Sequence, residues 1–119
     1  MNKFKTFSIA LLATTFVAKA QDLNQAKKAI DAEQFEKAKS LLKSIIKAKP
    51  SDGEANFVLG NVYLNQAVVD SAKIYYKNGL EASDKKHLNY IGLGQLDLDS
   101  KNTVGAQVNF GLATKDIKR

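Results

Sequence analysis

The chain has 119 residues, of which 45% are apolar and 25% are charged, with a single Pro and a formal net charge of +6. This length leaves room for one domain. The lack of cysteine excludes disulfides, thiolate zinc sites, a cysteine nucleophile and the N-terminal Cys that anchors bacterial lipoproteins. One Pro and long periodic apolar stretches favour helix throughout.

Residues 1–20 have the pattern of a secretory signal peptide. Lys3 and Lys5 precede an uncharged, mostly apolar run of 12 residues, and Ala18-Lys19-Ala20 supplies a small-x-small cleavage pattern. The run is too short for a membrane span, which takes about 20 residues. We therefore expect cleavage before Gln21 and an exported protein, either periplasmic or associated with the cell envelope, or else secreted. A retained helix packed on the fold is the alternative.

Removal of residues 1–20, which contain three Lys and no acid, lowers the net charge to +3. This excess is too small to indicate nucleic-acid binding. Lys39, Lys43 and Lys47 recur at every fourth position of one predicted helix. We interpret this row as a solvated face, and contact with an anionic surface is the alternative interpretation.

The remaining apolar periodicity predicts six helices, at about 22–32, 35–48, 51–66, 68–82, 85–98 and 103–118. Pro50 ends the second helix, because Pro disfavours helical geometry in the residue before it. Ser51 and Glu54 are expected to form a capping box at the start of the third helix. Ser83 or Asp84 is expected to cap the fifth helix.

Much of the middle of the chain recurs with a period of 34 residues. Such a period indicates an array of helix pairs that bury their apolar faces by stacking. Small residues on first helices are expected to lie against alanines on second helices, with a large residue four positions after each alanine wedged between repeats. The three columns are Ala26, Gly60 and Gly94; Ala38, Ala72 and Ala106; and Leu42, Tyr76 and Phe110.

On these residues the chain resembles the tetratricopeptide repeat (TPR) family, most closely in its middle repeat. The resemblance covers about residues 19–119, in repeats at about 19–52, 53–86 and 87–119. It implies an all-α helical repeat solenoid over residues 21–119. It further implies a protein-interaction scaffold in the cell envelope that binds a protein or peptide partner.

In the TPR family, the first helices line a concave groove that receives peptides or partner helices. Mapped onto this chain, that face has two apolar columns and a polar row between them, which suits an amphipathic or extended partner. The predicted groove residues are Leu23, Lys27, Phe57, Asn61, Leu64, Ile91, Gln95 and Leu98, with Ile30 beside them. The alternative is that some apolar members, above all Ile30, Leu64 and Leu98, belong to the core. The Lys, Asn and Arg set that grips chaperone C-termini in some TPR proteins is absent.

Candidate catalytic residues are few. His87 is the only His and has no acid beside it in the sequence. Asp97 and Asp99 resemble solvated turn residues, because two carboxylates do not make a calcium site. We therefore predict a protein that is not an enzyme and that needs no cofactor or metal.

The last predicted helix is apolar where the end of a solenoid is usually polar. It carries Val104, Val108, Phe110, Leu112 and Ile117. One interpretation is that the chain is the N-terminal TPR module of a longer cell-envelope protein, whose activity lies in a following domain. The other is that a partner or a second copy covers this helix by self-association.

Overall fold

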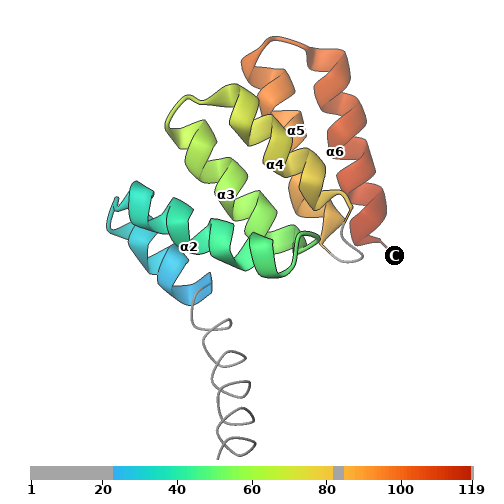
Figure 1. Cartoon of the computed structure of the whole chain (residues 1–119). Coiled ribbons are helices and arrows are strands. Elements are labelled where there is room, and N and C mark those ends of the chain that lie inside the picture. The colour runs from blue at the N-terminus through green and yellow to red at the C-terminus, as the bar shows by residue number, and fades with distance from the viewer. Residues whose placement is uncertain (1–22, 82–84, 119) are drawn as a thin grey trace, which may run out of the picture.

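The computed structural model describes residues 23–81 and 85–118, and these residues form helices joined by short turns (Figure 1). The first helix, at residues 23–31, precedes α2 (Phe35–Ala48), α3 (Gly53–Asn65), α4 (Val69–Gly79), α5 (Lys86–Asp99) and α6 (Thr103–Ile117). The predicted all-α helical repeat fold is thereby confirmed. The predicted signal peptide lies outside the described residues.

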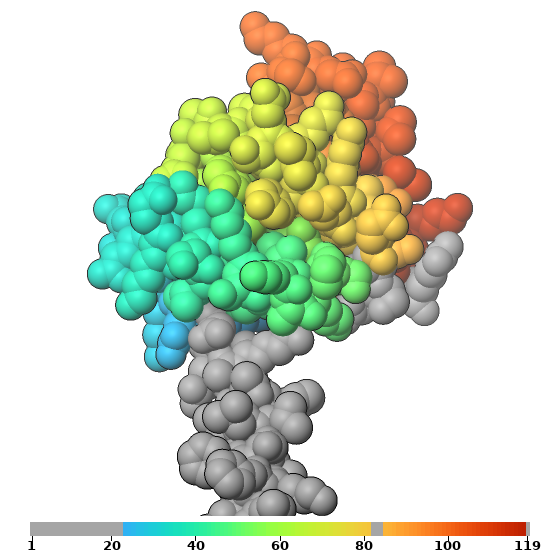
Figure 2. Space-filling view, viewed as in Figure 1, coloured from blue at the N-terminus to red at the C-terminus, as the bar shows by residue number. Residues whose placement is uncertain are grey.

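The helices stack as successive antiparallel pairs (Figure 1). The space-filling view shows the described segments following one another in chain order, from helix 23–31 to α6 (Figure 2). Helix 23–31 pairs with α2, α3 with α4, and α5 with α6, while α2 also packs on α3 and α4 on α5. Each second helix therefore lies against the first helix of the following pair, as expected for a repeat array. None of the helices in residues 23–81 and 85–118 has the length and apolar character that a membrane crossing requires.

The turn inside each pair repeats with the same period as the sequence. Each turn contains a non-glycine residue in the left-handed region: Glu33 (φ 59°), Ala67 (φ 61°) and Lys101 (φ 64°). The next amide in each turn, that of Gln34, Val68 or Asn102, donates to the carbonyl five residues earlier at 2.7, 2.9 and 2.8 Å. This is the Schellman helix ending, in which the left-handed residue lets two amides reach the last carbonyls.

Within residues 23–81 and 85–118, the buried residues form two clusters. The first joins helix 23–31, α2 and α3 through Ala26, Leu42, Ile45, Ala55, Leu59 and Val62. The second joins α4 to α5 through Ala72, Tyr76 and Leu96. The Tyr76 ring is fully buried and lies against Gly60 of α3 and Gly92 of α5. It is therefore wedged between two repeats, as expected.

Two packing glycines lie against large side chains of second helices. An added Cβ at Gly60 would meet the ring of Tyr76, and one at Gly94 would meet the ring of Phe110. Each glycine therefore leaves room for the large residue of its pair's second helix, and the expected contact with Ala72 or Ala106 stays a prediction.

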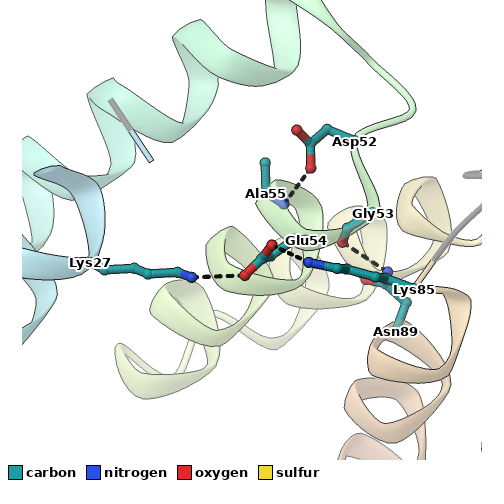
Figure 3. A network of polar contacts seen from close by, with 7 residues as sticks. All are labelled: Lys27, Asp52, Gly53, Glu54, Ala55, Lys85 and Asn89. Carbon is teal, nitrogen blue, oxygen red and sulfur yellow. Dashed lines mark hydrogen bonds and ion pairs between the residues drawn. The ribbon is translucent and has the colours of Figure 1, made fainter. Parts of the chain in front are cut away.

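The predicted capping box was wrong. Asp52 caps α3, and its Oδ1 accepts from the amide of Ala55 at 2.9 Å (Figure 3). Ser51 lies one residue too early, and Glu54 turns toward two lysines instead. At α5, the N-cap is Lys85, with φ 55° and no capping bond from its side chain. The expected caps Ser83 and Asp84 lie outside the described residues.

Candidate functional site

The predicted groove residues lie on the first helices of the three pairs, and none is fully buried. Lys27, Asn61, Ile91, Gln95 and Leu98 are exposed, while Leu23, Phe57, Leu64 and Ile30 are half-buried. Leu98 is 45% exposed and Ile91 39%, so neither is a core residue. Phe57 is partly a core residue, because its ring lies 6.1 Å from that of Tyr76, centroid to centroid.

A pocket of about 520 Å³ lies between helix 23–31 and α3. Its lining is mostly aliphatic, with one aromatic ring and two amide side chains. The lining residues are Ile30, Phe35, Val58, Asn61, Val62, Leu64 and Asn65. Of the eight predicted groove residues, only Asn61 and Leu64 meet here, and the other six do not line this pocket.

Four of the pocket residues were not predicted as site residues: Phe35, Val58, Val62 and Asn65. Phe35 begins α2, which is a second helix, whereas the predicted face lies on first helices. Val58, Val62 and Asn65 each follow a predicted groove residue by one position, so a wider face on α3 would have included them.

Tyr76 orients the amide of Asn61. Its hydroxyl donates to Oδ1 of Asn61 at 2.5 Å. Burial, with a smaller effect of the Asp99 carboxylate, raises the pKa of Tyr76 to about 12, so the phenol keeps its proton at neutral pH. Asn61 also lines the pocket, where its amide supplies a polar group that can donate a hydrogen bond through its NH₂ group.

Glu54 joins the three repeats (Figure 3). Its Oε1 accepts from Nζ of Lys27 at 2.7 Å, and its Oε2 accepts from Nζ of Lys85 at 2.6 Å. The hydrogen bonds from Lys27 and Lys85 lower the pKa of Glu54. Lys27, a predicted groove residue, is therefore held in a structural ion pair at the start of α3.

Gln95, another member of the predicted polar row, is also bonded within the chain. Gln95 donates from Nε2 to Oδ1 of Asp99 at 2.9 Å, one turn later in α5. Lys27 and Gln95 have partners within the chain and do not line the pocket, whereas Asn61 does line it. Asn61 is the member of this row best placed to bind a partner.

The lysine row of α2 is more than a solvated face. The Lys39 side chain is only 15% exposed and pairs with Glu36 at 2.8 Å. Lys39 and Lys43 lie over the ring of Tyr63, with Nζ 5.1 and 5.6 Å from its centroid. A hydrogen bond with Tyr63 raises the pKa of Lys43. Two of the three lysines therefore help to hold α2 against α3.

His87 has an acidic neighbour that the sequence did not reveal. The backbone amide of His87 donates to Oδ2 of Asp116 at 3.0 Å, and Nδ1 lies 3.4 Å from the same oxygen. The two residues are 29 positions apart, so only the α5–α6 pairing brings them together. Asp116 provides the capping bond that Lys85 does not, which is a structural role.

Asp97 is likewise structural, which corrects its assignment as a solvated turn residue. Its Oδ2 accepts from Nδ2 of Asn109 at 2.7 Å and ties α5 to α6. Within residues 23–81 and 85–118, no three His, Cys, Asp or Glu side chains gather in a way that could hold a metal ion.

Fold and site together define a helical repeat protein with a mostly apolar pocket on its first-helix face. Comparison with known protein families and with curated proteins finds no match for this chain.

Proposed function

We propose that this chain is an exported, TPR-type binding scaffold of a bacterial cell envelope, which holds a segment of a partner protein on its first-helix face. The pocket between helix 23–31 and α3 carries this proposal. Its volume of about 520 Å³ falls in the range typical of ligand sites, about 300–1,000 Å³. It suits a large apolar side chain projecting from an extended segment or a helix.

The chemistry of the pocket supports a peptide ligand. Ile30, Val58 and Leu64 supply apolar contact, and burying one large apolar side chain contributes about 1.5–3 kcal/mol. The NH₂ group of Asn61 is positioned to donate to a backbone carbonyl of the partner. A few such contacts along the face support micromolar affinity after the costs of association.

Export is proposed from the sequence of residues 1–20, and the alternative of an N-terminal module in a longer envelope protein is compatible with the same pocket. In either case the scaffold itself binds rather than catalyses. The nature of the partner follows from the pocket: a segment with one large apolar side chain next to an accessible carbonyl.

The pocket can be tested without disturbing the fold. Asn61→Asp keeps an acceptor for the Tyr76 hydroxyl but replaces the donating amide, so we expect about tenfold weaker partner binding. Asn78→Asp, the same change on an exposed residue of α4, is the matched control. The partner would be captured by a photo-crosslinking residue at Asn65 and measured by titration calorimetry.

A second pair of variants tests the wider face. Ile91→Asp should abolish capture, whereas Ile74→Asp, at an exposed position of α4, should not. Equal capture by both members of each pair, with circular dichroism unchanged, would refute the assignment of the binding face.

A further inference from the structure

The outward side of α6 carries an apolar strip formed by Val104, Val108, Gly111 and Leu112. The three larger residues are 71%, 57% and 39% exposed. At Gly111, no atom lies within 4 Å of the position that a Cβ would take. Gly111 and Leu112 follow Val108 by three and four positions, and Val108 follows Val104 by four, so the four residues share one side of the helix. We refer to them as the α6 strip.

The repeat register shows that the α6 strip is not a stacking face. One and two periods earlier, the same positions are mostly polar, and all of them are exposed. They are Asp70, Ile74, Lys77 and Asn78 in α4, and Glu36, Ser40, Lys43 and Ser44 in α2. They stay exposed although α3 stacks on α2 and α5 stacks on α4. Lys43 reaches α3 with the end of its long side chain, over the ring of Tyr63, and the residue as a whole stays exposed. A further repeat stacked on α6 in the same way would leave the strip uncovered.

The side of α6 that faces away from the strip is more polar than its counterparts at one position. Thr114 stands where the earlier repeats have Ile46 and Leu80, which are half-buried. Phe110 keeps the place that Leu42 and Tyr76 have in the earlier repeats. The outward side of α6 nevertheless carries more apolar residues than that of α2 or α4, and stacking of a further repeat does not explain them.

The charges around the α6 strip are basic. Lys101 precedes it, and Lys115 and Lys118 follow on the same side of the helix. The acid of α6, Asp116, is bonded to His87. Antiparallel pairing of two strips about Val108 would place Lys101 against Lys115, and parallel pairing would place each lysine against its own copy. Like charges thus disfavour a second copy, whereas an anionic surface is complementary.

We propose that the α6 strip docks this protein peripherally on an anionic lipid surface. The aliphatic side chains enter the boundary between headgroups and acyl chains, and Lys101, Lys115 and Lys118 meet the phosphate groups. The strip lies on a second helix, whereas the pocket lies between first helices. Docking would therefore leave the pocket open to its partner.

The chain contains no Trp, so a single Val108→Trp substitution reports on the strip directly. Vesicles of phosphatidylcholine with phosphatidylglycerol should shift its emission to the blue, and brominated lipids should quench it. Vesicles of phosphatidylcholine alone should have no such effect. The matched control is Ser40→Trp, at the equivalent position of α2. Because the reporter is local, lipid contact by residues 1–20 does not imitate the signal.

Two sets of substitutions test whether the α6 strip and the three lysines around it cause the binding to lipid. Val104→Glu with Leu112→Ser, which restores the residue types of α2, should abolish the shift. Replacing Lys101, Lys115 and Lys118 by Gln should weaken vesicle binding at least about tenfold and remove its salt dependence. Absence of a shift with anionic vesicles would refute the proposal. So would a shift that depends on protein concentration alone, which would assign the strip to a second copy.

Discussion

The ring of Tyr76 in α4 lies directly against Gly92 of α5, where an added Cβ would come within 2.5 Å of ring carbons. Gly60 of α3 faces the same ring. One buried side chain thus sets the spacing between two repeats, and both glycines are needed because a helix bearing a side chain there could not approach it.

Gly92→Ala should destabilise the fold by about 1–3 kcal/mol, because the Tyr76 ring has no room to move away. Gly111→Ala is the matched control. It is also helical but faces open space, so alanine should stabilise by about 0.5–1 kcal/mol. Urea unfolding of both variants measures the two effects, and effects of the same sign would contradict this packing.

The buried phenol should make stability depend on alkaline pH. The pKa of Tyr76 is raised from 10.0 to about 12, so between these values the unfolded chain loses the phenol proton while the folded chain keeps it. The unfolded state then binds fewer protons, and stability falls as pH rises, by about 3 kcal/mol in total. Tyr76→Phe should lack this part of the pH dependence. If the free energy of unfolding fell equally steeply with pH in the two proteins between pH 9 and 11, this role of Tyr76 would be contradicted.

Glu54→Gln should weaken the contact between repeats. It removes the charge that attracts both Lys27 and Lys85, and we expect a loss of about 1 kcal/mol that shrinks at high salt. Since the pKa of Glu54 is lowered, its contribution is present above the unfolded pKa and is lost as pH falls through the folded value. Glu36→Gln, at a side chain 84% exposed, should have no measurable effect on urea unfolding.

Asp116→Ala should loosen the start of α5. The His87 amide would lose its acceptor, and removal of such a cap costs about 0.5–2 kcal/mol. Hydrogen exchange at the His87 amide should become faster. His87→Asn keeps the backbone bond and should leave both exchange and stability nearly unchanged, which separates the cap from the imidazole contact. A larger effect of His87→Asn than of Asp116→Ala would assign the role to the side chain.

Ala67→Gly should stabilise the protein by about 0.5–1 kcal/mol, because Ala67 has φ 61°, a region that costs a residue with a Cβ about 1 kcal/mol or more. Ala48→Gly, at the exposed and helical end of α2, should instead destabilise. Thermal unfolding of the two variants compares them directly, and a destabilised Ala67→Gly would argue against the left-handed turn.

Helix positions and repeat spacing were predictable because they depend on local periodicity. The bounds of α2 follow from Pro50 and the apolar pattern, and the column of Ala38, Ala72 and Ala106 sets the register. The candidate site was predicted only in part. Asn61 and Leu64 line its pocket, but the groove predicted from the TPR resemblance gave no reason to choose Phe35 or Asn65.

The sequence by itself determined the helices and the buried side of each, since apolar periodicity shows both within a few turns. It also determined the 34-residue period, since the repeated residues can be compared directly along the chain. Tertiary structure alone decided which long side chains meet across repeats. It placed the Tyr76 ring against two glycines, Glu54 between two lysines, and Asp116 at the start of α5. Such pairings depend on how helices cross in space, and one sequence carries no local signal for them.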